Sequence, residues 1–277
     1  MKKFNFILAM TVVAMGATSC GSNKNEESKT LVLYYSLTGN TKTVAEEIAS
    51  RLNADIEEVT CVTPYDTNFQ ACIERSMQER EAGVLPEINP VKADLSKYDV
   101  IFIGYPVWFG TYAPPIATWL NSVDLSGKKV ALFCTFGSGG LESSQFNFMK
   151  QQPNTEVLGG YGVRAARLDA MPKEVEQFLI LHHFIDGELQ NVEPWGNEHP
   201  VTDEETAIFD AAVDGYPMLH AKALRATSHP IAGGTEYNFI AEDLPREDRP
   251  DMPTVGEIQV WVIALDGQAP VFTRVVR

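Results

Sequence analysis

The sequence contains few cysteines: Cys20, Cys61, Cys72 and Cys134 in 277 residues. So small a number cannot form the dense disulfide framework that stabilises small secreted domains. Neither these cysteines nor the five scattered histidines have the spacing of a metal site. Cys134 lies in an apolar stretch, which favours a buried thiol, whereas Cys61 and Cys72 could form a disulfide or stay free.

Basic residues are also scarce, since 22 Lys and Arg are outnumbered by 37 Asp and Glu and the formal net charge is −15. An acidic surface repels nucleic acid and anionic lipid headgroups, so we expect no nucleic-acid partner. The charge suits a basic partner protein. A solvated acidic surface that keeps the chain soluble would explain the same balance.

Long hydrophobic stretches are missing beyond the N-terminus. Two lysines precede an apolar stretch over residues 4–16, which is too short to span a membrane, and Ala17-Thr18-Ser19-Cys20 follows with the small residues of a cleavage site. This pattern resembles a bacterial lipoprotein signal, which implies a signal peptide over residues 1–19 and a lipid on Cys20.

The polar residues 20–29 then read as a flexible tether to the first domain. We therefore expect a lipoprotein anchored through Cys20 to a membrane of the bacterial cell envelope, at the periplasmic face or in the outer membrane. A plain secretory signal with an incidental cysteine is the alternative.

Strand and helix patterns alternate between residues 30 and 183. Alternation predicts an α/β domain with a parallel sheet, right-handed crossovers and helices on both faces. Ligands of such sheets bind outside the carboxyl ends of the strands, where the strand order reverses. The expected strands are residues 31–35, 54–60, 100–104, 130–134 and 156–163. The expected helices are residues 116–121, 142–150 and 173–182. Two more helices are expected, one that carries Val44, Ile48 and Leu52 and one within residues 64–82.

The stretch Ser36-Leu37-Thr38-Gly39-Asn40-Thr41 connects the first expected strand to the first expected helix. A helix N-terminus offers unpaired backbone N–H groups and the positive end of the helix dipole. With hydroxyl groups and a flexible glycine added, this turn is typical of a phosphate site. An ordinary helix cap is the alternative reading.

Two further loops follow the third and fourth strands at the same edge of the expected sheet. The first, residues 105–112, carries Trp108 and Phe109 between a proline and Gly110, where a planar aromatic ligand could stack. The second, residues 135–140, is rich in glycine, which lets backbone amides approach a ligand. Each loop alone is a weak signal, but three at one edge predict a binding site.

The three loops together resemble those of the flavodoxin family, over about residues 30–182. The resemblance implies a five-stranded sheet of order 2-1-3-4-5 in a flavodoxin-like FMN-binding domain over 30–183. It implies that Ser36, Thr38, Asn40 and Thr41, with the backbone of Leu37 and Gly39, bind the FMN phosphate. It also implies that Trp108 stacks on the flavin ring, framed by Pro106, Val107, Phe109 and Gly110 and by Thr135, Phe136, Gly137, Ser138 and Gly139. Phe136 replaces the tyrosine that usually covers the second face.

After a linker over residues 184–199, the pattern changes to a second, smaller α+β domain over 200–277. Thr202 and Glu205 fit a capping box that starts a helix, and period-two alternation follows, with a turn at Asp266-Gly267. The segment over about residues 200–276, most of all His229-Pro230-Ile231-Ala232-Gly233, resembles the cystatin family, whose hairpin at this place enters cysteine proteases.

Two departures argue against protease inhibition as the role of this domain. His229 and Pro230 replace the usual Gln and Val, and Leu265-Asp266 replaces the usual Pro-Trp of a second hairpin. A docking or spacing module is the better expectation, since function depends on the site and not on the fold.

We expect an electron carrier that uses FMN at the cell envelope and serves an unidentified redox partner protein. No side chain in the three loops is an evident acid or base, which favours electron transfer over catalysis. An FMN-dependent NAD(P)H:quinone-type oxidoreductase is one alternative. An envelope binding module that contacts proteins through its cystatin-like domain is another.

Overall fold

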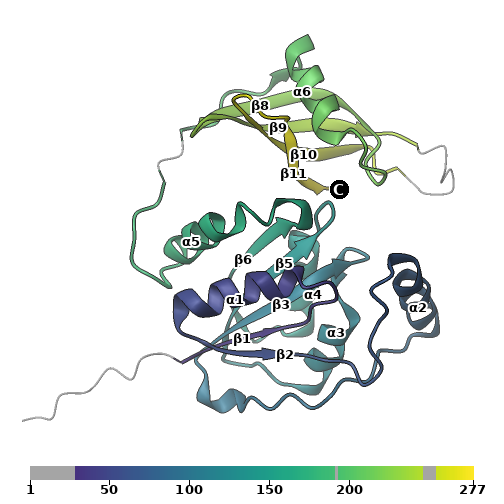
Figure 1. Ribbon diagram of the computed structural model, residues 1–277, viewed down its shortest axis with the longest axis vertical. Coiled ribbons are helices and arrows are strands. Elements are labelled where there is room, and N and C mark those ends of the chain that lie inside the picture. Colours follow the sequence, from purple (N-terminus) through teal and green to yellow (C-terminus); the bar gives the residue numbers. More distant parts are fainter. Residues whose placement is uncertain (1–28, 191–192, 246–253) are drawn as a thin grey trace, which may run out of the picture.

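The computed structural model describes residues 29–190, 193–245 and 254–277, which form two sheets with their helices (Figure 1). The predicted signal peptide (1–19), the predicted lipidation site Cys20 and nearly all of the predicted tether (20–29) lie outside these residues. Within the described ranges no helix has the length and apolar character needed to cross a membrane. The same ranges hold no cluster of three or more His, Cys, Asp or Glu placed to bind a metal ion.

The first sheet is parallel along the path β2-β1-β3-β5-β6. This order confirms the predicted 2-1-3-4-5, because the extra strand β4 is only a short hairpin arm on β3. The elements are β1 (Thr30–Tyr34), α1 (Asn40–Leu52), β2 (Asp55–Glu58), α2 (Phe69–Ala82), a 3-10 turn (Leu95–Lys97), β3 (Val100–Trp108), β4 (Thr111–Tyr112), α3 (Pro114–Ser122), β5 (Lys129–Phe136), α4 (Leu141–Gln151), β6 (Glu156–Arg164), a second 3-10 turn (Ala165–Arg167) and α5 (Met171–Leu181).

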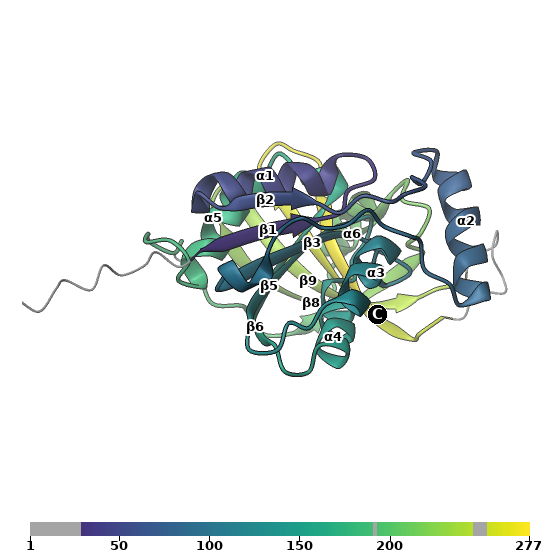
Figure 2. The same cartoon turned by 90° about the horizontal axis from the view of Figure 1, so that it is seen from below.

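Helices cover both faces of this sheet, with α1 and α5 on one face and α3 and α4 on the other (Figure 2). Successive side chains of a strand point to opposite faces. Val32 and Tyr34 of β1 therefore pack with α1 and α5, whereas Leu31 and Leu33 join the core under α3 and α4. Burial on both faces explains why this strand reads as continuously apolar.

Two strands extend beyond their predicted ends. β3 continues to Trp108 because Val107 and Trp108 pair with β4, and β5 continues to Phe136 because it pairs with β6 as far as Arg164. Pro106, Val107 and Trp108, with Thr135 and Phe136, are therefore strand residues, where the sequence predicted loops. Pairing partners far along the chain decide these strand ends, and an apolar run does not reveal them.

The second sheet is antiparallel, in the order β11-β10-β9-β8-β7, and its core is closed by α6. It confirms a second unit with one helix and antiparallel strands. The predicted capping box is present, since the Thr202 hydroxyl accepts the Glu205 amide at 3.2 Å and the Glu205 carboxylate accepts the Thr202 amide at 2.9 Å. The elements are β7 (His199–Pro200), α6 (Asp203–Val213), β8 (Ala221–Ile231), β9 (Gly234–Asp243), β10 (Glu257–Leu265) and β11 (Val271–Val276).

The two sheets meet where β5 and β6 of the first end. Arg164, the last residue of β6, donates to the Gly137 carbonyl at 2.9 Å and to the Phe272 carbonyl of β11 at 2.8 Å. Its guanidinium also lies 3.5 Å from the centre of the Phe272 ring. Arg274 of β11 pairs with Glu142 of α4 at 2.9 Å. The second sheet is thus docked on the edge where the sequence predicts the ligand.

The three described cysteines, Cys61, Cys72 and Cys134, are free and buried. The open question of a Cys61–Cys72 disulfide is resolved in favour of free thiols. Burial raises the pKa of Cys61 to about 11, so this thiol stays protonated at neutral pH. Cys134 has no exposed surface, which confirms the predicted buried thiol.

Candidate functional site

The turn between β1 and α1 presents a row of backbone N–H groups. Gly39 occupies the N-cap with φ = 91°, a left-handed conformation that glycine adopts without strain. The amides of residues 37–41 donate no hydrogen bond to any described residue, whereas the Lys42 amide donates to the Ser36 hydroxyl at 3.2 Å. These free donors lie at the positive end of the α1 dipole and could bind an anion without a nearby cation.

One hydroxyl of this turn has a structural partner instead. Thr41 is only 1% exposed, and its hydroxyl lies 2.8 Å from the hydroxyl of Thr135 at the end of β5. The bond ties the first predicted loop to the third. Ser36, Gly39 and Asn40 are half-buried and Thr38 is exposed, so they remain accessible from solvent.

Trp108 lies at the end of β3, just before a tight turn in which Phe109 and Gly110 have φ of 51° and 77°. It is half-buried, and the rings of Tyr35 and Tyr65 meet it edge-on at centroid distances of 6.1 Å and 5.0 Å. Arg75 of α2 lies over Tyr65 at 3.9 Å. These contacts fix the indole at the wall of a cavity instead of in the core.

The glycine-rich turn after β5 is held from two sides. The Ser143 hydroxyl of α4 donates to the Gly110 carbonyl at 2.5 Å, which joins this turn region to the Trp108 hairpin. On the other side the Val275 amide of β11 donates to the Ser138 carbonyl. A Cβ atom on Gly139 would lie 2.1 Å from the Val275 carbonyl oxygen, so only glycine permits this close approach.

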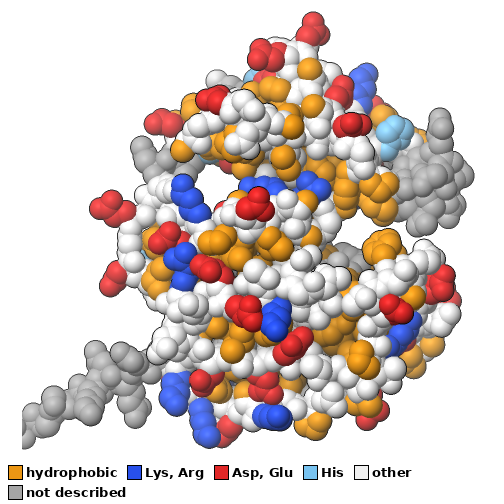
Figure 3. Space-filling view, in the orientation of Figure 1, with side chains coloured by type: hydrophobic (Ala, Val, Ile, Leu, Met, Phe, Trp, Pro, Cys, Tyr) orange, Lys and Arg blue, Asp and Glu red, His pale blue; other side chains and the backbone are white. Residues whose placement is uncertain are grey.

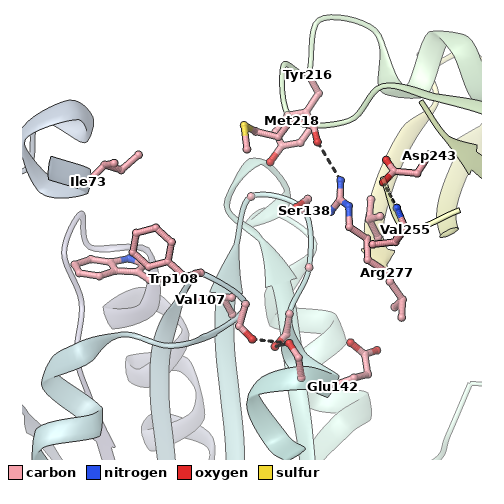
Figure 4. A pocket seen from close by; sticks show the side chains of 18 of the residues that line it. Ile73, Val107, Trp108, Ser138, Glu142, Tyr216, Met218, Asp243, Val255 and Arg277 are labelled. Carbon is pink, nitrogen blue, oxygen red and sulfur yellow. Dashed lines mark hydrogen bonds between the residues drawn. The ribbon is translucent and has the colours of Figure 1, made fainter. Parts of the chain in front are cut away.

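A cavity of about 880 Å³ opens at this edge, between the first sheet, α2 and the second sheet. Hydrophobic side chains lie on both sides of the gap between α2 and the second sheet (Figure 3). Figure 4 shows Trp108 on one side of the cavity and Tyr216 and Met218 on the other. The predicted site residues that line it are Leu37, Val107, Trp108, Phe109, Gly110, Gly137, Ser138 and Gly139.

The other predicted site residues do not line this cavity. Ser36, Thr38, Gly39, Asn40 and Thr41 form the turn beside it, Pro106 continues β3, and Thr135 and Phe136 end β5. Phe136 is only 6% exposed and packs in the core, so its ring faces away from the position that the sequence assigned to it.

Sequence reasoning missed Tyr65, Arg164 and Tyr216. Tyr65 holds the indole of Trp108, and Tyr216 lines the cavity from the second domain. Burial raises the pKa of Tyr65 well above its usual value, and its hydroxyl donates to Glu79, so it stays a neutral phenol at neutral pH. No local pattern marks these residues, because each acts through a contact with a distant part of the chain.

The charged groups of the cavity wall are already paired. Glu142 binds Arg274, the Arg277 guanidinium donates to the Met218 carbonyl at 3.0 Å, and the Asp243 carboxylate accepts the Val255 amide at 3.2 Å. Burial raises the pKa of the Cys72 thiol, which also lines the cavity, so it is no thiolate at neutral pH. The arrangement offers an anion site, an aromatic wall and an apolar space, and the imidazole of His220, whose Nδ1 lies 2.7 Å from the Pro245 carbonyl oxygen, also lines the cavity.

Comparison with known proteins supports the same fold. A Clostridioides difficile (strain CD3) protein, flavodoxin-like domain-containing protein BilS, is 27% identical over 199 residues, covering 69% of this chain and 96% of the relative. An NAD(P)H dehydrogenase (quinone) of Gluconacetobacter diazotrophicus is 32% identical over 135 residues, or 43% of this chain and 63% of the relative. The match therefore spans less than two thirds of that enzyme.

Solved structures lead to the same fold. The crystal structure of a candidate flavoprotein from Bacteroides eggerthii DSM 20697 is 28% identical and superposes with a TM-score of 0.50, covering 56% of this chain and 98% of that one. The sequence profile of the flavodoxin family matches residues 29–176. This match covers more than half of the 277 residues and coincides with the parallel sheet, so the chain belongs to the flavodoxin family.

Proposed function

We propose that the chain binds FMN and transfers electrons through it. The observation that carries the proposal is the row of unpartnered amides at residues 37–41, which lies at the same sheet edge as the cavity wall formed by Trp108. A terminal phosphate fits the first feature, because five N–H groups and the α1 dipole favour a dianion. A planar ring fits the cavity wall, because the indole of Trp108 could stack on the ring and the apolar cavity of about 880 Å³ has room for it.

The residues divide into two groups by the part of FMN that they would hold. The amides of residues 37–41 and the side chains of Ser36, Thr38 and Asn40 would bind the phosphate, while Thr41 keeps the turn in place through Thr135. Trp108 would lie against the ring, with the backbone near Gly110 and Gly137 along its edge. FMN, when bound, supplies one-electron and two-electron chemistry.

The role of electron carrier stays our first proposal, in line with the flavodoxin family and with the lack of an evident acid or base in the three predicted loops. The redox partner would be another protein, and the acidic chain suits a basic one. Anchoring to the bacterial envelope through Cys20 is proposed from the N-terminal sequence alone.

A likeness of the second domain to cystatins is also proposed from sequence. Its hairpin residue His229 is 3% exposed, stacks on Trp195 at 4.1 Å and lies 2.9 Å from the Glu236 carboxylate. A side chain buried in this way cannot enter a protease cleft. Protein docking or spacing therefore remains the proposed role of this hairpin.

One observation favours the alternative of an FMN-dependent oxidoreductase of the NAD(P)H:quinone type. The second domain covers the ring edge and creates an apolar cavity there, which a carrier that docks proteins does not need. A steady-state assay with NADPH and a quinone separates the two. Rapid turnover by the protein alone would favour the enzyme, and no turnover would favour the carrier.

The central test is uptake of FMN by the chain over residues 21–277. We expect FMN to bind at or below about micromolar concentration, with quenching of its fluorescence, and riboflavin to bind at least about tenfold more weakly because it lacks the phosphate. Trp108→Ala should weaken binding, whereas the control Trp195→Ala, whose indole stacks on His229 and does not line the cavity, should not. Failure to take up FMN at micromolar concentration would disprove the proposal.

A further inference from the structure

The cavity beside the flavin loops has walls that FMN binding does not require. Besides the loops of the first sheet, it is lined by Phe69 and Ile73 of α2 and by Met218 and Val276 of the second domain. We propose that this interdomain cavity binds a second molecule, uncharged, flat and apolar, next to the flavin ring. The inference rests on the proposed binding of FMN.

Several exposed apolar side chains gather around this cavity. Phe69 is 76% exposed, Phe146 54%, Phe109 48% and Met218 43%, and all four line the same space from α2, α4, the Trp108 hairpin and the second domain. Scattered exposed apolar residues need no explanation, but a group around one cavity indicates a binding surface. Covering these side chains would remove apolar area from water and so stabilise a complex.

The size and place of the cavity suit a small molecule. Its volume of about 880 Å³, part of which the flavin ring would occupy, lies within the range of roughly 300–1,000 Å³ that is typical of small-molecule sites, and such sites often form between domains. A stable protein partner would instead need about 800 Å² of accessible surface. Here the second domain faces the flavin loops across the gap (Figure 4) and leaves only a cleft.

The polar groups of the wall decide the class of the ligand. Arg277 is bound to the Met218 carbonyl, Glu142 to Arg274 and Ser143 to the Gly110 carbonyl. The rest of the wall is mostly apolar, with Phe69, Phe146 and Met218, so a charged ligand would lose hydration that these side chains do not replace, whereas an uncharged apolar one would not. The aromatic rings of Trp108 and Phe109 favour a flat shape, because aromatic pairs gain stability from stacked or edge-on contacts.

The test uses the FMN-loaded chain and N-phenyl-1-naphthylamine, an uncharged two-ring probe whose fluorescence rises in apolar surroundings. Flavin content is first fixed by absorption, so failure of FMN binding is seen separately. We expect saturation at one probe per chain and a perturbed flavin spectrum. Met218→Asp and Phe69→Asp should each weaken probe binding at least tenfold with flavin content unchanged. Leu181→Asp, 55% exposed and outside the cavity, should not.

Three outcomes would overturn the inference. The first is probe binding to the flavin-free chain that FMN abolishes by competition, because the cavity would then hold only the ring. The second is non-saturable binding, or equal binding by Met218→Asp and Leu181→Asp, which would indicate general surface hydrophobicity. Probe binding that a basic protein but no small molecule displaces would point to a protein partner and would also contradict it.

Discussion

Gly39 is the residue on which the proposed phosphate site depends most directly. Its φ of 91° is left-handed, and a Cβ atom there would meet nothing within 4 Å. Gly39→Ala therefore adds backbone strain of roughly 1–2 kcal/mol without a clash. We expect the turn to relax, to turn its amides away, and to lose at least tenfold in FMN affinity by fluorescence titration.

A matched control comes from the same chain. Gly83 ends α2 with φ = 66° and equally open space. Gly83→Ala should lower the free energy of unfolding by a similar amount yet leave FMN affinity unchanged. Equal loss of affinity in both variants would mean that Gly39 acts only through overall stability.

The hydrogen bond between the hydroxyls of Thr41 and Thr135 holds the turn of residues 36–41 against the end of β5. Thr41→Val leaves the buried Thr135 hydroxyl without its partner, which costs roughly 1–3 kcal/mol. Replacing both residues by Val removes the unsatisfied group, so the double variant should be more stable than the single one. Urea unfolding of the flavin-free protein measures the free energy of unfolding of Thr41→Val, Thr135→Val and the double variant. Thr43→Val, whose side chain is exposed, serves as control. A double variant that loses the sum of the single losses would contradict the role given to this bond.

At the scale of elements, the apolar runs were sufficient to predict the first sheet. Residues 31–35 and 100–104 are buried on both faces, and strands buried in this way consist of nearly continuous apolar residues. The turn of residues 36–41 was also predictable, because a cap is a local feature. The ends of β3 and β5 were not, because pairing with β4 and β6 sets them.

The start of α6 gives a prediction on pH. The Asn197 carbonyl and the Glu205 carboxylate hydrogen-bond His199 and raise its pKa above the usual 6.5, with Glu205 Oε1 at 3.0 Å from Nε2. A folded-state pKa above the unfolded one stabilises the fold at low pH, and the effect is lost as pH rises through the folded pKa. The second domain should therefore become less stable from about pH 6 to pH 8 relative to His199→Gln.

Urea unfolding followed by tryptophan fluorescence at several pH values measures this difference. His220→Gln is the control, since this exposed side chain has its own carbonyl partner at Pro245 and does not touch α6. A difference between wild type and His199→Gln that stays constant across this range would disprove the proton linkage. Glu205 titrates below this pH range. Burial raises the pKa of its carboxyl group, but hydrogen bonds from Thr202 and His199 outweigh burial and lower it.

At the scale of the whole molecule, the sequence predicted two domains but not how they meet. Arg164, Tyr216 and Phe272 follow no local pattern that distinguishes them from ordinary surface residues. They become part of the candidate site because the second sheet docks on the turn after β5. Phe136, which the sequence placed at the edge of the ring, is buried in the core, whereas Tyr216 of the second domain lines the cavity.

We expect this docking to couple the stabilities of the two domains. Burial lowers the pKa of Arg164, but guanidinium remains charged at neutral pH and binds both Gly137 and Phe272. Because FMN binds the folded state, it should stabilise the first domain by about 2.7 kcal/mol at 100 times its Kd. Through Arg164 it should also raise the unfolding midpoint of the second domain, whose described residues form no hydrogen bond or ion pair with residues 36–41.

Arg164→Gln should break this linkage. We expect calorimetry to show that FMN raises the unfolding midpoints of both domains in the wild type, but only that of the first domain in the variant. The variant should also bind FMN more weakly, because the turn at Gly137 is no longer held. Arg167→Gln is the matched control, since Arg167 pairs with Glu174 at 2.8 Å within the first domain. If FMN still shifts the unfolding midpoints of both domains in Arg164→Gln, Arg164 does not carry the coupling, and the contacts that survive the substitution, the Val275–Ser138 backbone bond and the Arg274–Glu142 ion pair, would have to carry it.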